Sequence, residues 1–199
     1  PNFIKNCENR LKDYFPKSSL LIDSLRDCAI MLVNATGEYD TKIEDLDFSN
    51  KFSCQFSIAG KVFNPLNLKK FYSNYYNSKE NLKLIFPNER NFSVEQIDFA
   101  NYCTYIAKTN ALLKEYYLSI IKPLLSKKNL EILNTLSCYL LDYNSEIKRV
   151  SEKLYIHRNT VQNRLQKAQE LTGYKLGSLP DDYYLYTALA LNRIGTFKI

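Results

Sequence analysis

The sequence predicts an α+β N-terminal domain with a small antiparallel sheet and helices, followed by a long helix and an all-α C-terminal domain. Two observations support this division. Apolar and polar residues alternate in parts of the first half, as in strands with one buried face, whereas beyond residue 125 apolar residues recur only at helical spacing. A chain of 199 residues can form two small domains, each with its own core. We place these domains at 1–92 and 126–199, joined by a helix over 93–125.

The composition is that of an ordinary globular protein, and it excludes several classes. Hydrophobic residues make up 45% of the chain, yet no apolar run reaches the roughly 18 residues of a membrane span. The five glycines are isolated, so the chain has no phosphate-binding loop and is not an ATP-driven activator. We therefore expect a cytoplasmic protein without a cofactor. Because the chain begins at Pro1, without a methionine or a signal-peptide pattern, it is consistent with a piece cut from a longer protein.

The cysteines form an odd, scattered set without a CxxC pair. Four of the five lie within apolar patterns, which is typical of reduced, buried thiols in a cytoplasmic protein. With His157 as the single histidine, the chain lacks the ligands of a structural zinc site. A thiol sensor is the alternative, although no sequence feature marks one cysteine as activated. The cysteines are Cys7, Cys28, Cys54, Cys103 and Cys138.

Apolar spacing assigns the elements of the first half in order. Helical stripes alternate with strand-like runs, of which CAIMLV is the most apolar. Helices are expected over 3–15, from Ser18 or Ser19 to Arg26, and over 65–76. Strands are expected over 28–33, 52–58 and 82–86.

The order of these elements resembles that of small sensor domains of the GAF or PAS type. The segments that carry the resemblance are AIMLVNATGEYD, FSCQFSIAGKVFNP and LKLIFPNERNFSVEQIDFANYCTYIAKTNALL. The likeness lies in the pattern of elements and not in a motif. It implies a sensor or dimerisation domain over 1–92, and no residue identifies a ligand for it.

The long helix is predicted to begin after Ser93, which forms a capping box with Gln96. A spacing of four and three residues then indicates a heptad seam, with Asn110 at one core position, where a polar residue can fix the register of a dimer. Two interpretations stay open: a dimer seam, or packing within the chain, for which neighbouring apolar residues such as Leu112 argue. The seam residues are Phe99, Cys103, Ile106, Asn110, Leu113, Tyr117 and Ile120.

The C-terminal third is predicted to begin with three helices in succession. Leucines over 130–141 share one face of an amphipathic helix, and Asn144–Ser145 breaks the chain after it. A short helix over 147–154 follows, and a tight turn through Tyr155–Ile156 leads to the next. Two short helices joined by such a turn form a helix-turn-helix.

The second helix of this pair begins at His157 or Arg158. It ends at Gly173, a residue suited to the left-handed position that follows a helix. Its inward-facing residues are Val161, Leu165, Ala168 and Leu171.

The outer face of this second helix carries side chains that can read base edges. Arginine pairs with guanine, asparagine or glutamine with adenine, and threonine touches a thymine methyl. Residues 127–199 hold 11 Lys and Arg against 7 Asp and Glu, a net charge of +4 that suits an anionic partner. The alternative is a helix whose polar face is merely solvated. Candidate base contacts are His157, Arg158, Asn159, Thr160, Gln162, Asn163, Arg164 and Lys167, and candidate DNA-backbone contacts are Lys148, Arg149 and Lys153.

The segment EILNTLSCYLLDYNSEIKRVSEKLYIHRNTVQNRLQKAQELTGYKL resembles the C-terminal helix-turn-helix of PucR/CdaR-type transcriptional regulators. The signature L-x-[IV]-H-R-N-T-[LV]-x-x-R-L-x-[KR], followed by E-L-T-G, is matched from Leu154 to Gly173. The resemblance covers about residues 118–194 and implies a recognition helix that starts at His157. Gln162 and Asn163 stand where the family commonly has Arg and Tyr, which puts the base preference in doubt. The GGDEF-like region that such regulators often carry is not visible in the first half.

Together these features predict a dimeric, DNA-binding transcription regulator controlled by a signal at its N-terminal domain. The expected partners are double-stranded DNA, a second copy and a small-molecule effector of unknown identity, with no membrane. A catalytic role for His157 would need a partner constellation that is not visible, so we expect no enzyme. Two alternatives stay open: a ligand-binding or protein-docking module in which the helix-turn-helix contacts protein, and a cysteine redox sensor.

Overall fold

The computed structural model describes residues 67–89 and 91–196, together with Lys5, Asn9 and the backbone of 19–25, 28–34 and 57–59. The chain divides into two compact units, Pro1–Gly60 and Lys61–Ile199. The helices that precede residue 110 thus belong to the same unit as the C-terminal helices, and the division at 1–92, 93–125 and 126–199 stays a prediction. None of the described helices is long and apolar enough to cross a membrane.

The first unit contains an antiparallel pair of strands, β1 (Ser19–Leu25) and β2 (Cys28–Asn34), and the short strand β3 (Ser57–Ala59). The strand predicted over 28–33 is confirmed. The helix expected from Ser18 or Ser19 to Arg26 is wrong, because this segment pairs with β2 from Ser19 opposite Asn34 to Leu25 opposite Cys28. Only two residues separate the strands, a length that favours a hairpin over a helix. Apart from Lys5 and Asn9, the helix expected over 3–15 lies outside the described residues, as does most of the strand expected over 52–58.

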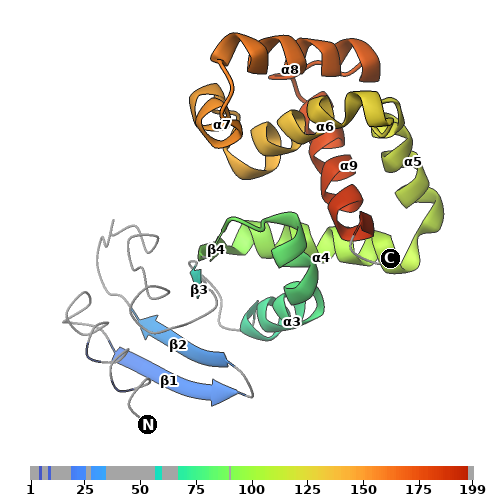
Figure 1. The fold of residues 1–199 in the computed structure, drawn as a ribbon. Helices are drawn as coiled ribbons and strands as arrows, with labels where there is room; N and C mark the ends of the chain where they lie inside the picture. The colour runs from blue at the N-terminus through green and yellow to red at the C-terminus, as the bar shows by residue number, and fades with distance from the viewer. Residues whose placement is uncertain are drawn as a thin grey trace. The chain divides into compact units, whose positions relative to one another are not determined.

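The second unit is built almost entirely of helices (Figure 1). In chain order these are α3 (Asn67–Ile85), α4 (Val94–Thr109), α5 (Ala111–Ile121), α6 (Leu130–Ser137), α7 (Ile147–Leu154), α8 (Arg158–Thr172) and α9 (Asp181–Thr196). The shorter elements are β4 (Asn91–Ser93), the 3-10 turns η2 (Lys122–Leu124) and η3 (Lys127–Asn129), and η4 (Cys138–Asp142), one π-helical turn that extends α6.

The strand expected over 82–86 is wrong, because α3 continues to Ile85. Leu82, Ile85 and Phe86 are buried, but they recur with Tyr75 and Ser78 at intervals of three and four residues along α3. That spacing places them on one helical face. The short alternating run that suggested a strand is the buried edge of this face, which packs against α4.

The expected helix over 93–125 consists of two helices, with the break at Asn110. Its start is confirmed: Gln96 N–H donates to Ser93 Oγ at 3.3 Å, and Ser93 N–H donates to the Gln96 side chain at 2.9 Å. At Asn110 the side-chain oxygen accepts a hydrogen bond from Leu113 N–H at 3.0 Å and so caps α5. Asparagine side chains compete in this way with the helical backbone, and here the competition ends α4.

The residues assigned to the heptad seam are mostly buried by their own chain. Phe99 packs on Tyr186 of α9, with ring centroids 4.8 Å apart. This burial favours packing within the chain over a dimer seam, although Leu112, which had argued for such packing, is exposed. Buried seam residues are Cys103, Ile106, Tyr117 and Ile120; Phe99 and Leu113 are half-buried, and Asn110 is exposed.

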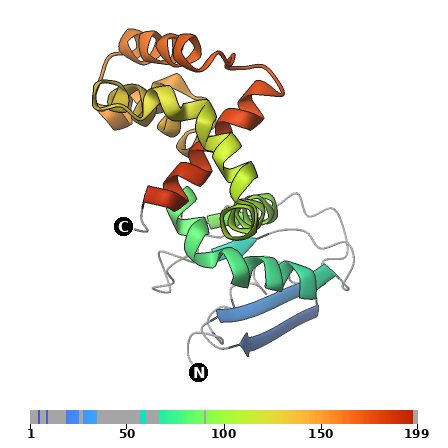
Figure 2. The ribbon, with the colours of Figure 1, turned by 90° about the vertical axis from the view of Figure 1, so that its right-hand side faces the viewer.

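Helix α9 is the central helix of the second unit. Thr187, Ala188, Leu189, Ala190 and Leu191 are all buried, so along this stretch the helix is covered on every side. It packs against α3, α4 and α5, and against η4; Figure 2 shows α9 crossing α5. The last helix of the chain therefore joins the helix-turn-helix region to the helices that precede it.

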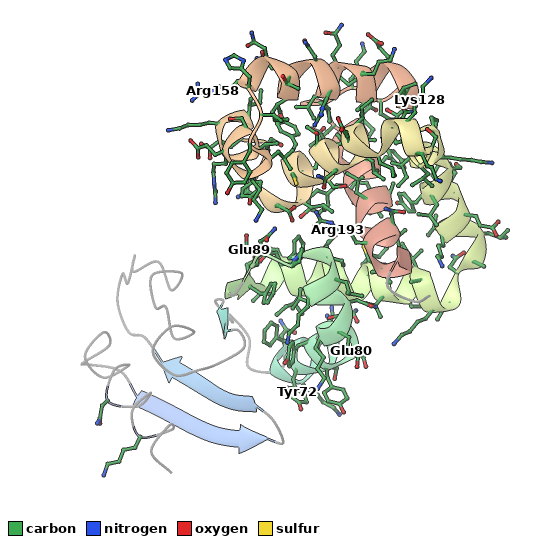
Figure 3. All side chains as sticks on the ribbon, in the orientation of Figure 1. Tyr72, Glu80, Glu89, Lys128, Arg158 and Arg193 are labelled. Atoms are coloured by element: carbon green, nitrogen blue, oxygen red, sulfur yellow. The ribbon has the colours of Figure 1, made fainter. Side chains whose placement is uncertain are left out.

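A buried ion pair fixes this junction. Arg193 of α9 donates to both carboxylate oxygens of Asp142, at 2.8 and 2.7 Å, and also to the backbone carbonyl of Ile85 at the end of α3. The Asp142 side chain is 3% exposed and that of Arg193 is 16% exposed. Figure 3 shows Arg193 where α9 passes the end of α3. One side chain thus connects three segments that lie far apart in the sequence.

Replacing Asp142 with alanine is expected to lower the free energy of unfolding by about 3 kcal/mol, because it leaves a buried guanidinium without its counter-charge. Urea denaturation of the wild type and of Asp142→Ala measures this change. Glu146→Ala is the matched control, since Glu146 pairs with Arg149 at 4.0 Å across an exposed surface, where ion pairs stabilise far less. Equal losses of unfolding free energy in the two variants would contradict the conclusion that the Arg193–Asp142 pair fixes the junction.

Candidate nucleic-acid interface

Helices α7 and α8 are joined by a three-residue turn. Tyr155 takes up the left-handed conformation after α7, and Ile156 N–H donates back to Ser151 O at 3.1 Å. His157 then caps α8: its Nδ1 accepts a hydrogen bond from Asn159 N–H at 3.2 Å. The helix-turn-helix and its second helix starting at His157–Arg158 are confirmed.

The inner face of α8 is apolar and holds the helix against α6 and α7. Val161, Leu165 and Ala168 are buried, as their spacing predicted, and Leu171 is half-buried. Gly173 ends the helix with φ of 78°, the left-handed conformation that glycine adopts without steric cost. At the start of the motif, Asn144 and Ser145 also have positive φ and separate η4 from α7.

Arg164 points toward α6 and not away from the motif. Its guanidinium pairs with the carboxylate of Glu131 and donates to Thr135 Oγ1 at 3.4 Å. The guanidinium is therefore engaged with α6 in this structure, and a role of Arg164 as a base contact stays a prediction. Because Arg164 lies three residues after the buried Val161 and four before the buried Ala168, it stands at the edge of the inner face. Thr160, four residues earlier, is half-buried in the same way.

The remaining candidates on α8 are exposed, and they differ in charge along the helix. The Lys167 ammonium pairs with Glu170 at 2.9 Å, which leaves the C-terminal half of the outer face nearly neutral. At the other end, Arg158 has no ion-pair partner among the residues that the structure describes, and Figure 3 shows it at the start of α8. The exposed candidates are His157, Arg158, Asn159, Gln162, Asn163 and Lys167.

The three basic residues of α7 are also exposed. Arg149 is engaged locally, since it pairs with Glu146 and its guanidinium lies over the ring of Tyr143 at 5.1 Å from the centroid. Lys148 and Lys153 are exposed on the same short helix. These basic residues and Arg158 lie on α7 and the first turn of α8, together with the exposed acidic residues Glu146 and Glu152.

The cysteines of the second unit are not activated. Cys103 and Cys138 are free and buried. Burial raises the pKa of Cys103 to about 12 and that of Cys138 to about 11, so both remain neutral thiols near pH 7. Within the described residues, no cluster of His, Cys, Asp and Glu could hold a metal ion. The side chains of Cys7, Cys28 and Cys54 lie outside the description.

A double-mutant cycle tests the position of Arg164. Arg164→Ala and Glu131→Ala are expected to couple by up to about 1 kcal/mol in the free energy of unfolding, because Glu131 is largely exposed and exposed pairs are weak. The control cycle pairs Arg158→Ala with Glu131→Ala and should show no coupling. Coupling between Arg158 and Glu131, or no coupling between Arg164 and Glu131, would contradict the contact of Arg164 with α6.

Native-state alkylation tests the thiols. At pH 8, Cys103 and Cys138 should react with iodoacetamide far more slowly in the folded protein than in urea, since burial disfavours the reactive thiolate. Mass spectrometry of the labelled peptides gives the rate at each cysteine. A native rate close to that of the unfolded chain would make either residue a candidate redox sensor again.

The segment that contains the helix-turn-helix is similar to a known family of domains. Residues 132–191, which run from α6 through most of α9, match the model of the PucR C-terminal helix-turn-helix domain. The chain is 37% identical over 84 residues to the purine catabolism regulatory protein of Bacillus subtilis, covering 41% of this chain and 16% of that protein. It is 44% identical over 50 residues to the carbohydrate diacid regulator of Escherichia coli, covering 25% of this chain and 13% of that protein.

A third relative matches more of the chain. The proline-responsive transcriptional activator PutR of Bacillus subtilis is 30% identical over 161 residues, which is 73% of this chain and 38% of that protein. The chain thus spans less than two-fifths of each of these three relatives. The family model and the relatives together support one family for the C-terminal part of the chain, that of regulators with a PucR-type helix-turn-helix domain.

Proposed function

We propose that this chain is part of a DNA-binding transcriptional regulator that reads the major groove with the N-terminal half of α8. One observation carries the proposal: within a segment that matches the PucR helix-turn-helix model, Arg158, Asn159, Gln162 and Asn163 are exposed on the helix that follows the turn. The second helix of such a motif is the one that enters the groove, with its N-terminal residues on the base edges.

Each exposed side chain has a role that follows from its chemistry. Arg158 is suited to a guanine, and Gln162 and Asn163 are suited to adenines. His157 positions the first turn of α8 through its cap, and the N–H groups of that turn favour a phosphate. Lys148 and Lys153 supply sequence-independent contacts to the DNA backbone.

The outer part of α8 beyond Asn163 has a smaller role in this scheme. Lys167 would have to leave Glu170 to reach DNA, at little cost because exposed ion pairs are weak. Arg164 is a positioning residue, since its guanidinium binds α6 through Glu131 and Thr135. Base preference then rests mainly on Arg158, Gln162 and Asn163.

A dimer would bring two such helices to half-sites about 34 Å apart, one turn of DNA. The purine catabolism regulatory protein, the carbohydrate diacid regulator and the proline-responsive activator are named for different small molecules. These names support control by a signal that is received outside the shared helix-turn-helix. For this chain we propose such control through the residues before α6, without assigning an effector, and a GAF- or PAS-like N-terminal domain remains part of this proposal.

Arg158→Ala is expected to weaken binding to a selected operator by about tenfold or more, because a bidentate arginine–guanine contact discriminates by about 1–3 kcal/mol. Fluorescence anisotropy with a duplex chosen by selection on the wild type measures the loss. Lys108→Ala removes the same charge from the exposed end of α4 and is the matched control.

The same titration at several salt concentrations tests the proposal as a whole. The logarithm of the wild-type affinity should fall linearly with the logarithm of the salt concentration, as counterions are released from DNA. Binding that does not change with salt, or an Arg158→Ala variant that binds as the wild type does, would contradict the assigned surface.

A further inference from the structure

The turn between α7 and α8 contains a residue whose side chain does not contribute to the packing of the fold. Tyr155 follows α7 with φ of 53° and ψ of 42°, in the left-handed region, and 95% of its surface is exposed. Within the described part of the chain, its side chain has no hydrogen bond, ion pair or ring contact. A large aromatic ring therefore stands in solvent on a strained backbone.

The backbone conformation makes this residue costly to the fold. A Cβ atom is crowded in the left-handed region, where glycine is the default and short polar residues are tolerated because they can hydrogen-bond locally. Among the described residues, the other non-glycine residues with positive φ are Asn144 and Ser145, which are short and polar. A glycine at 155 would close the same turn with less strain, as Gly173 does at the end of α8.

The position of Tyr155 suggests what compensates for this cost. It lies two residues before His157, the cap of α8, and between the exposed basic residues Lys153 and Arg158. In Figure 3, Arg158 marks this end of the helix. The tyrosine hydroxyl is one of the side-chain groups that donate to phosphate oxygens in protein–DNA complexes, and its ring offers an apolar surface beside that polar group.

We propose that Tyr155 binds the DNA backbone at the edge of the groove that α8 enters. Its hydroxyl donates to a phosphate oxygen, and its ring covers the adjoining deoxyribose. This inference rests on the proposed function, and it adds a contact that carries no charge and reads no base. Tyr155 lowers the stability of the free protein through its backbone conformation, and in the complex its side chain adds a contact to the DNA backbone.

Tyr155→Gly separates these two effects, because it relieves the backbone and removes the ring together. Its thermal midpoint should equal or exceed that of the wild type, while its affinity for duplex DNA falls about tenfold, the loss expected for a hydrogen bond to a charged group. The loss should be the same on the selected operator and on an unrelated duplex, since a phosphate contact is independent of sequence. The slope of affinity with salt should not change, because tyrosine is neutral.

Two further variants refine the measurement. Tyr155→Phe keeps the ring and removes the hydroxyl, so its affinity should lie between those of the wild type and Tyr155→Gly. Asn144→Gly relieves a left-handed residue at the other end of α7; it should bind DNA as the wild type does.

The outcomes distinguish this inference from the proposed function. If the wild type binds DNA with a normal salt dependence and Tyr155→Gly binds equally well, the inference alone is overturned. If that variant also loses activation or repression in a reporter assay, the ring belongs to a protein contact instead. A lower thermal midpoint for Tyr155→Gly would mean that the tyrosine ring stabilises the folded protein. This result would also overturn the inference. If the wild type shows no salt-dependent binding to DNA, both the proposed function and this inference are overturned.

Discussion

The geometry of the second unit depends on the ion pair between Arg193 and Asp142. Asp142 closes the π-helical turn that leads into the helix-turn-helix, and Arg193 lies near the end of the buried helix α9. The same guanidinium binds the carbonyl of Ile85, a free acceptor at the end of α3. Buried charges need such complete pairing, so the positions of α3, α9 and the start of α7 are mutually constrained. Any movement of one relative to the others would break at least one of these bonds.

If the proposed control by a signal holds, this constraint would connect the helices before α6 to the helix-turn-helix. A signal that moves α3 or α4 would act on Arg193, and Arg193 in turn holds the segment before α7. The aromatic contacts of Phe99 with Tyr186 and with Phe86 reinforce the same junction. Packed elements of this kind respond by switching between arrangements and not by gradual bending. The break at Asn110 divides α4 from α5.

Sequence reasoning predicted the C-terminal elements well, because their signals are local. The capping box at Ser93, the stop at Gly173 and the buried spacing of Val161, Leu165 and Ala168 each depend on a few neighbouring residues. The predictions that were wrong concern segments whose structure depends on tertiary packing. The segment 82–86 has the alternation of a strand but lies on a helix that needs α4 to bury it.

Arg164 and Arg193 make contacts that the local sequence pattern did not indicate. Arg164 belongs to the signature that marks the motif, yet its partner Glu131 is 33 residues away, and helical position alone could have indicated its inward direction. The partner of Arg193 is 51 residues away, and no local pattern connects the two. Long-range pairs of this kind have no signature in a single sequence.

In the proposed complex with DNA, the uneven charge along α8 limits how much DNA sequence one copy of the chain would distinguish. The stretch from Arg158 to Asn163 rises by about 9 Å, roughly the length of three base pairs of DNA. A sequence of three base pairs occurs far too often in a genome to specify the binding site of one gene. The neutral Lys167–Glu170 pair adds little information beyond it. If α8 reads DNA as proposed, one helix-turn-helix would distinguish too few base pairs to select a single gene, and a second copy of the short sequence at a fixed distance would supply the rest.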